Sequence, residues 1–270
     1  MLLEFTKMSG AGNDFVFIDN RAQKISLTGK QIAQLGHRHF GIGFDGLGLL
    51  IPCASGKADW AWRFYNSDGS EAEMCGNGSR CFARYIQRLT GAKDGLTFET
   101  LAGVITAKFL PGKRVTVNLT SPKGLRLNET VQLSTGPATV HFLNTGVEHA
   151  VIFVPDVEKT LINVTGSEIR YHKHFAPKGT NANFVQILGP NHIRVRTYER
   201  GVEGETLACG TGVTASSLIT SKIHNFKSPI KVQVQGGDEL EVSFDTNGDQ
   251  FSNVCLTGPG EFVFEGKIEV

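Results

Sequence analysis

Two cysteines, each followed by glycine, are the residues in this sequence best suited to chemistry. Cys75 lies in the stretch Glu71-Ala-Glu-Met-Cys-Gly-Asn-Gly78, and Cys209 lies in Glu205-Thr-Leu-Ala-Cys-Gly-Thr-Gly212. The glutamate, the cysteine and both glycines of the first stretch recur in the second after a shift of 134 positions (75 to 209). Since this shift is almost half of the 270 residues, the pattern predicts two copies of one structural unit.

Each cysteine is expected at the start of a helix, because helix-like runs follow at 79–89 and at 213–224. A helix N-terminus offers free N–H groups and the positive end of the helix dipole, which stabilise a thiolate and bind a carboxylate. Thiols placed there have pKa values of roughly 3.5–7.5 instead of about 8.5. Two such helix starts facing each other would put two sulfurs on opposite sides of one small anion.

A duplicated cysteine favours a reaction that is symmetric in reactant and product. One nucleophilic cysteine with a base partner would suffice for covalent catalysis. Inversion of a stereocentre instead needs a base on one face of a carbon and an acid on the other. No stretch resembles the lysine motif of pyridoxal enzymes, and the cysteine spacing fits no usual zinc site. The residues therefore predict a racemase or epimerase with no cofactor and no metal.

The composition is that of a soluble globular protein, with 40% hydrophobic residues, 20% charged residues and a net charge of +1. This balance gives no reason to expect a nucleic-acid partner. Neither a signal-peptide core nor an apolar stretch of about 20 residues is present, so no membrane partner is expected and a cytoplasmic location is predicted. Five cysteines, an odd number, argue against a disulfide framework. Cys53, Cys81 and Cys255 are interpreted as small core residues.

Strand patterns outnumber helix patterns and favour an α+β fold. Further helices are expected at 31–40, ending before Gly41, and within 157–172. Each half should form a mostly antiparallel or mixed β-sheet curled around a central helix, with the active site in the cleft between the two pseudo-symmetric domains. A break at 121–124 divides the domains, which are predicted as residues 1–120 with the strand 262–270, and residues 121–261.

The repeat extends beyond the cysteines. Gly12 shifted by 134 positions falls on Gly146, and the stretch 43–45 has a looser counterpart in 179–181 after a shift of 136. The letters Gly-x-Gly-x-x-Gly at 41–46 match a dinucleotide motif, but they follow a helix pattern and precede a strand. A dinucleotide site has the opposite order, so no such cofactor is predicted.

Seven segments, in order over nearly the whole chain, resemble diaminopimelate epimerase. They are Lys7-Met-Ser-Gly-Ala-Gly-Asn-Asp-Phe15, His39-Phe-Gly-Ile-Gly-Phe-Asp45, Tyr65-Asn-Ser-Asp-Gly-Ser70, Met74-Cys-Gly-Asn-Gly-Ser-Arg80, Gly179-Thr-Asn-Ala-Asn-Phe184, Tyr198-Glu-Arg-Gly201 and Ala208-Cys-Gly-Thr-Gly212. The resemblance implies conversion of LL-2,6-diaminopimelate to the meso form, on the route to lysine and peptidoglycan. It also implies two pseudo-symmetric domains, usually a homodimer, with the last strand returning to the first domain.

The resemblance also assigns roles by position. Cys75 and Cys209 match the base and the acid, and His149 and Glu199 match residues that tune the pKa of the two thiols. The remaining matches are to substrate-binding residues, namely Asn13, Asn66, Gly76, Asn77, Asn181, Glu199, Arg200, Gly210 and Thr211. Taken alone, the asparagines could merely shape turns, His149 could be structural, and Glu199-Arg200 could be a surface pair.

Two departures from the family pattern concern the substrate. Many members carry Gln where this chain has Gly46, and Asn-Pro where it has Val147-Glu148. Glu203 also lengthens the segment between Glu199 and Cys209 by one residue relative to one common form. The first two departures suggest looser recognition, with slow racemisation of other dicarboxylic amino acids such as glutamate. The sequence also leaves open a proline-racemase-like or phenazine-pathway-like isomerase, and a binding protein for an acidic ligand.

Overall fold

The computed structural model describes residues 1–270 and divides into two compact units. Unit 1 comprises Met1–Asn118 and Thr257–Val270, and unit 2 comprises Leu119–Leu256. The chain thus passes between units after residues 118 and 256, where the sequence had placed the passages after 120 and 261.

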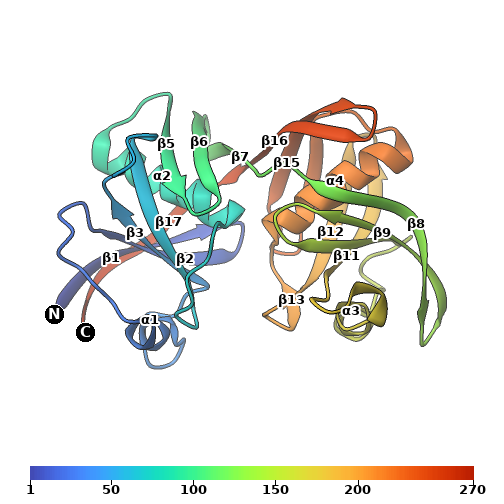
Figure 1. Ribbon diagram of the computed structural model, residues 1–270, viewed down its shortest axis with the longest axis horizontal. Coiled ribbons are helices and arrows are strands. Elements are labelled where there is room, and N and C mark those ends of the chain that lie inside the picture. The colour runs from blue at the N-terminus through green and yellow to red at the C-terminus, as the bar shows by residue number, and fades with distance from the viewer. The chain divides into compact units, whose positions relative to one another are not determined.

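Unit 1 is a mixed sheet whose strands pair in the order β17, β1, β2, β3, β4, β5, β6, β7. The β2–β3 and β4–β5 pairs are parallel and the other pairs in this order are antiparallel. Figure 1 shows β1 and β17 side by side, with the two chain ends together. The strands are β1 (Leu2–Gly10), β2 (Asn13–Asp19), β3 (Gly46–Ile51), β4 (Trp60–Asn66), β5 (Gly95–Thr100), β6 (Gly103–Leu110), β7 (Arg114–Asn118) and β17 (Glu261–Glu269).

Unit 2 is a second mixed sheet, with strands paired in the order β8, β9, β10, β11, β12, β14, β15, while β13 also pairs with β12. Here β10–β11 and β12–β14 are the parallel pairs. The strands are β8 (Lys123–Leu133), β9 (Gly136–Asn144), β10 (Glu148–Phe153), β11 (Asn181–Gly189), β12 (His192–Glu199), β13 (Gly204–Thr206), β14 (Ile230–Val234), β15 (Glu239–Asn247) and β16 (Gln250–Pro259), which continues into unit 1.

The register of the two sheets identifies equivalent positions. In unit 1 Phe15 pairs with Gly46, and in unit 2 His149 pairs with Asn181. Phe15 and His149 are 134 positions apart, so the repeat equivalent of Asn181 is Gly46. The sequence alignment of 43–45 with 179–181 was therefore wrong by one residue, because it matched glycines without knowing the strand pairing.

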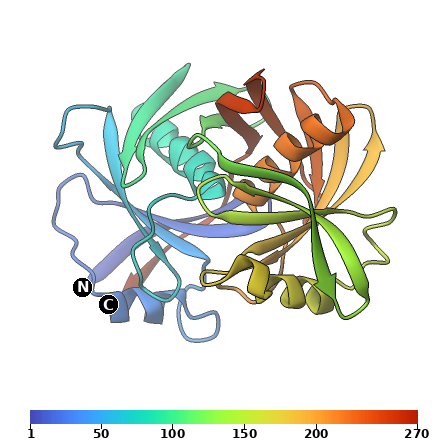
Figure 2. The same ribbon diagram turned by 45° about the vertical axis from the view of Figure 1, so that its right-hand side comes forward.

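Each sheet has a long helix on one face and a short helix on the other. Side chains alternate between the two faces of a strand. In unit 2, Ala182 and Phe184 of β11 join the core that contains Ile162 and Ile169 of α3 (Ile162–Arg170), whereas Asn183 between them contacts α4 (Gly210–His224). In unit 1, α1 (Gly29–Gly36) likewise packs on one face of the sheet and α2 (Gly76–Thr90) on the other. Figure 2 shows the strands of unit 2 between α3 and α4; a short 3₁₀ turn, η1 (Lys173–Phe175), follows α3. The α+β prediction is confirmed.

The long helices begin and end alike. Both have 15 residues, and Cys75 and Cys209 are their N-cap residues, as the sequence predicted. Both end at a residue in the left-handed conformation, Gly91 with φ of 73° and Asn225 with φ of 56°. Glycine and asparagine are the residues that adopt this conformation most readily. The 134-residue repeat (91 to 225) therefore includes the stop signal as well as the start.

Two local predictions were wrong. Helix α1 ends at Gly36 and not at Phe40, because the N–H groups of Ile42 and Gly43 fold back onto the carbonyl oxygen of Leu35. Phe40 is 77% exposed and belongs to no apolar helix face. Cys53 lies beyond the end of β3 and is half-buried, with its sulfur 3.4 Å from the carboxylate of Glu99, so it is not a core residue. Cys255, in β16, is also only half-buried. The interpretation as a core residue therefore holds only for Cys81, which is fully buried.

None of the helices combines the length and the apolar character that crossing a membrane would require.

Candidate functional site

The repeated glutamate fixes the approach to each cysteine. Glu71 accepts a bond from Arg63 of β4 at 3.0 Å, and Glu205 accepts two bonds from Arg196 of β12 at 2.6 and 2.7 Å. Each pair ties the segment before the cysteine to the neighbouring strand. The glutamate therefore recurs because it positions the start of the helix, four residues before the cysteine in both units.

In unit 1 the sulfur of Cys75 sits among the first N–H groups of α2. It accepts a bond from the backbone N–H of Gly78 at 3.4 Å, and lies 3.9 Å from the side-chain oxygen of Asn13. The amide nitrogen of Asn77 donates to the same oxygen at 3.4 Å. The structure thus brings together Cys75, Gly76, Asn77 and Asn13, which we call the unit 1 half-site.

Arg80 supports this half-site and was not predicted. Its side chain is fully buried, donates to the amide oxygen of Asn77 at 2.9 Å, and donates to the carbonyl oxygen of Pro259 at 3.1 Å. A charged residue three positions after Asn77 on a helix was the available signal, since residues at that spacing share one face.

A charged network lies on the other side of Asn13. The amide nitrogen of Asn13 donates to the carboxylate of Asp45, which also accepts from Arg38 at 2.7 Å. Arg38 forms a fork with Asp14 at 2.9 and 3.0 Å, and Lys7 bonds Asp14 at 2.6 Å. Burial, followed by the nearby charge of Asp14, raises the pKa of Asp45. Although burial opposes it, bonding from Arg38 and Lys7 holds the pKa of Asp14 well below its ordinary value.

In unit 2 the sulfur of Cys209 has a different partner. No side-chain capping bond joins it to the first turn of α4, and it lies 3.6 Å from the hydroxyl of Thr211. The hydroxyl of Thr145 donates to the carbonyl oxygen of Thr211 at 2.8 Å and holds this turn against the end of β9. Cys209, Gly210 and Thr211, with His149 beside them, form what we call the unit 2 half-site.

His149 is fully buried against the start of α4, where a Cβ on Gly212 would lie 3.3 Å from its ring. The amide nitrogen of Asn183 lies 3.1 Å from Nδ1 of His149 and also donates to the carbonyl oxygen of Ala150 at 2.9 Å. Nδ1 therefore accepts and Nε2 carries the proton, with no protein partner. Burial, with the positive charge of Arg200, lowers the pKa of His149 to about 3, so the ring is neutral at neutral pH.

One end of the antiparallel β11–β12 pair carries Asn181, Glu199 and Arg200. Asn181 begins β11, Glu199 ends β12, and Arg200 follows it. The side-chain oxygen of Asn181 accepts from the backbone N–H of Arg200 at 2.8 Å, and its nitrogen donates to the carbonyl oxygen of Glu148 at 2.8 Å. Glu199 accepts a bond from Thr206 at 2.9 Å. Asn66, at the equivalent end of β4, bonds Ser70 at 3.0 Å within a turn.

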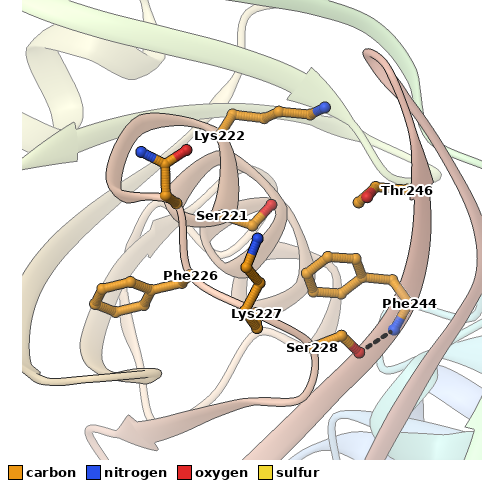
Figure 3. A pocket seen from close by; sticks show the side chains of 8 residues that line it. Ser221, Lys222, Phe226, Lys227, Ser228, Phe244 and Thr246 are labelled. Atoms are coloured by element: carbon orange, nitrogen blue, oxygen red, sulfur yellow. Dashed lines mark hydrogen bonds between the residues drawn. The ribbon is translucent and has the colours of Figure 1, made fainter.

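A separate hollow lies at the opposite end of α4 from Cys209. This cavity of about 220 Å³ is shown in Figure 3, where Ser228 accepts a bond from the backbone of Phe244. Its lining residues are Ser221, Lys222, Asn225, Phe226, Lys227, Ser228, Phe244 and Thr246. At 1.5 Å per residue a helix of this length spans about 20 Å, so the hollow is no part of the unit 2 half-site.

The diaminopimelate epimerase family model matches residues 5–124 and 141–263. The chain belongs to the diaminopimelate epimerase family. It is 42% identical to the diaminopimelate epimerase of Aquifex aeolicus, over 98% of both chains. It is 38% identical to that of Acinetobacter baumannii, over 100% of this chain and 98% of the other. The chain is therefore an isomerase, as predicted.

Solved structures from other protein families share the fold of this diaminopimelate epimerase family member. A phenazine biosynthesis protein of the PhzF family from Bacillus anthracis has a TM-score of 0.75 at 14% identity, with full coverage of both chains. A hydroxyproline epimerase from Agrobacterium vitis, solved with bound trans-4-hydroxy-L-proline, has a TM-score of 0.74 at 16% identity, over 99% of this chain and 92% of the other. Proline-racemase-like and phenazine-pathway-like proteins are thus relatives in fold.

The departures from the diaminopimelate epimerase pattern have physical counterparts. A Cβ on Gly46 would lie 2.4 Å from the ring of Phe64, so that ring occupies the space where a longer side chain would start. Glu148 accepts a bond from the guanidinium of Arg200 at 2.8 Å, and both side chains are about four-fifths buried, with exposures of 20% and 23%. Arg200 therefore already has a carboxylate partner within the chain.

Proposed function

We propose that this protein epimerises LL-2,6-diaminopimelate to the meso form with Cys75 and Cys209 as the two proton-transfer groups. The observation that carries the proposal is that each cysteine caps a 15-residue helix in one of two matching units, in a chain of the diaminopimelate epimerase family. A binding protein would have no need for a sulfur at both positions.

The reaction balances with one proton in transit. A thiolate removes the α-hydrogen of one stereocentre as a proton, which leaves the electron pair on the carbon next to the carboxylate. The thiol of the other cysteine delivers its proton to the opposite face of the same carbon. After one turnover the thiol and the thiolate have exchanged places, so no cofactor is needed. Inversion requires that both sulfurs act on the same α-carbon.

The α-carboxylate is the group that must absorb the developing charge. Backbone N–H groups at Gly76 and Asn77, and at Gly210 and Thr211, open the two helices. We assign them to the two oxygens of this carboxylate, because preorganised N–H donors and helix dipoles stabilise an anion that forms in the transition state. Asn13 would contact the substrate next to Cys75, because its side-chain oxygen lies 3.9 Å from the sulfur.

The second amino-acid end of diaminopimelate carries a carboxylate and an ammonium group. Arg200 suits the carboxylate and Glu199 suits the ammonium, with Asn66 and Asn181 as polar neighbours. Arg200 uses Nη1 for its bonds to Glu148, Lys178 and Gly179, which leaves the Nε and Nη2 edge of the guanidinium for the substrate. His149 and Glu199 are proposed to tune the two thiols through hydrogen bonding, and neutral His149 would do so as a donor through Nε2.

The test is to incubate the purified protein with LL-diaminopimelate and to separate the stereoisomers by chiral chromatography. Formation of the meso isomer without added pyridoxal phosphate or metal, up to the equilibrium ratio from either side, is the expected result. L-Proline and trans-4-hydroxy-L-proline serve as control substrates, because they lack a second charged end. Epimerisation of these controls, with no reaction of diaminopimelate, would refute the assignment.

A broader amino-acid racemase is the second candidate, and the Glu148–Arg200 pair is the observation that favours it. A carboxylate already bound to Arg200 reduces the net charge offered to a distal carboxylate, and Phe64 fills the space at Gly46. We therefore infer slow racemisation of L-glutamate. Exchange of its α-hydrogen for deuterium, followed by NMR, tests this. An absence of exchange for every amino acid except diaminopimelate would contradict it.

We propose, on the family resemblance, that the protein works as a cytoplasmic homodimer in the synthesis of lysine and of a peptidoglycan precursor. Light scattering on the purified protein tests the dimer, and growth of a lysine- and diaminopimelate-requiring bacterial strain on expression of the chain tests the role. A monomer at micromolar concentration, or growth only with added diaminopimelate, would count against the respective statement.

A further inference from the structure

Two arginines, two asparagines and one aspartate form a chain of hydrogen bonds beside Cys75. Arg80 donates to the oxygen of Asn77, Asn77 donates to the oxygen of Asn13, and Asn13 donates to the carboxylate of Asp45. Arg38 donates to the other oxygen of that carboxylate. The charged groups at the two ends fix the direction of the middle bonds.

The orientation of both amides follows from those ends. A guanidinium can only donate and a carboxylate can only accept, so Asn77 must turn its oxygen to Arg80, and Asn13 must turn its nitrogen to Asp45. The oxygen of Asn13 is consequently the atom that faces the sulfur of Cys75, at 3.9 Å. With the carboxylate of Asp45 absent, nothing at that end would prevent the amide of Asn13 from rotating by half a turn.

This orientation matters for the protonation state of the sulfur. Cys75 meets an acceptor, the oxygen of Asn13, and a donor, the N–H of Gly78 at 3.4 Å. A thiol can donate to the first and accept from the second, whereas a thiolate faces the lone pairs of an oxygen. Cys209 has the hydroxyl of Thr211 as its neighbour at 3.6 Å, which can donate to a thiolate.

We propose that Asp45 is a positioning residue, which acts through Asn13 to hold Cys75 in the thiol form before substrate binds. Cys75 then starts as the acid and Cys209 as the base. The inference rests on the proposed two-cysteine function and names which sulfur carries the proton first. Arg38 strengthens the effect because it holds Asp45 in place through a charge-assisted bond.

Other charged groups near Cys75 also affect the pH at which its thiol ionises. The ionisable groups on the surrounding elements include Lys7 of β1, Asp14 of β2, Arg38 and Asp45 of the loop between α1 and β3, Glu71 and Glu73 of the segment before α2, and Arg80 and Cys81 of α2. Loss of the Asp45 charge would itself make a nearby thiolate easier to form. The experiment must therefore separate this direct effect from the effect relayed by Asn13.

A double-mutant cycle makes the separation. In the full-length Cys209→Ser protein, the rate of alkylation of Cys75 by iodoacetamide is measured from pH 5 to 10 by mass spectrometry, with half-buried Cys255 as an internal reference. Asp45→Ala is introduced with Asn13 present and with Asn13→Ala. We expect Asp45→Ala to lower the titration midpoint by about one pH unit with Asn13 present, which is about tenfold in rate below the midpoint. With Asn13→Ala, the shift should fall to about a third of that.

An unchanged or higher midpoint for Asp45→Ala, or an equal shift in both backgrounds, would overturn the proposal. Thermal unfolding is recorded for each variant. If Asp45→Ala does not unfold cooperatively, Asn13→Ala alone decides, because loss of the acceptor oxygen must lower the midpoint and an unchanged midpoint refutes the proposal. The alkylation needs no turnover, so failure of the proposed epimerase activity would be visible separately, in the conversion of diaminopimelate.

Discussion

The two units share a backbone plan but differ in what fills the space behind each helix start. Strand pairing makes Phe15 equivalent to His149, and a Cβ on the following glycine of each helix, Gly78 or Gly212, would lie 3.3 Å from Cε1 of that ring. On the adjacent parallel strand, two residues after the partner of Phe15 or His149, unit 1 has Gly48 and unit 2 has Asn183. One helix therefore begins against aromatic rings and the other against a polar network.

The partner strands compensate for this difference. Gly48 pairs with Phe64, whose ring covers the glycines of β3, whereas Asn183 pairs with Thr197, whose hydroxyl donates to it at 2.9 Å. A small residue opposite a large one, and two medium residues opposite each other, fill similar volumes. Similar packing volume therefore fixes both helix starts in the same position, although the side chains next to the two sulfurs differ between the units.

Loss of either sulfur should have the largest effect, because both are needed for inversion. Cys75→Ala and Cys209→Ala are each expected to lower the rate of epimerisation by about 10³-fold, within the usual range for a missing acid or base. Binding of diaminopimelate, measured by calorimetry, should remain in both variants. A variant that keeps more than a tenth of the activity would show that one half-site suffices.

Alanine at the second helix glycine should distinguish the two interiors. A Cβ on Gly212 would lie 2.3 Å from the side-chain oxygen of Asn183. Hydrogen bonds with Thr197, Ala150 and His149 hold the Asn183 side chain in place. We expect Gly212→Ala to lower the free energy of unfolding by about 3 kcal/mol. The matched variant is Gly78→Ala, whose nearest atoms lie at 3.3 Å, and it should cost about 1 kcal/mol.

Urea unfolding of both glycine variants checks this order. Equal costs would mean that the polar network of unit 2 yields as easily as the rings of unit 1.

The two glutamate–arginine pairs differ in burial and should differ in strength. Arg196 and Glu205 are only 12% and 17% exposed, so Arg196→Ala leaves a largely buried carboxylate without two bonds and should cost about 2 kcal/mol of unfolding free energy. Arg63 and Glu71 are 54% and 36% exposed, and Arg63→Ala should cost less than about 1 kcal/mol. Urea midpoints measure both, and a reversed order would contradict the comparison.

Acid should weaken unit 2 through His149, which has no titratable equivalent in unit 1. Below about pH 6.5 the unfolded chain binds a proton at this position, while folded His149 stays neutral down to its pKa of about 3. The free energy of unfolding should therefore fall by up to about 1.4 kcal/mol per pH unit as the pH drops through this range. Urea unfolding of the wild type and of His149→Gln at several pH values measures the difference, and parallel curves would refute it.

The sequence predicted the features that repeat as identical letters. Cys75 and Cys209, with the glycines beside them, located both helix starts because the same residue types do the same work in each unit. Arg80 and Asp45 were missed as supporting residues, because their roles depend on contacts with Asn77 and Asn13 that are set by tertiary packing. The correspondence of the Gly48–Phe64 pair with the Asn183–Thr197 pair could not be predicted either. Residues that compensate for each other across paired strands need not be identical in the two repeats, so the sequences show no match at these positions.

The central claim is that two sulfurs share one inversion, and the early course of deuterium incorporation tests it most directly. LL-Diaminopimelate is incubated with the enzyme in deuterium oxide and sampled by NMR and chiral separation within the first few per cent of conversion. Inversion by two cysteines predicts deuterium at the inverted carbon of the meso product while the remaining substrate keeps its hydrogen, because the acid delivers a solvent-derived deuteron. Label in substrate and product at equal rates, or hydrogen retained in the product, would contradict it.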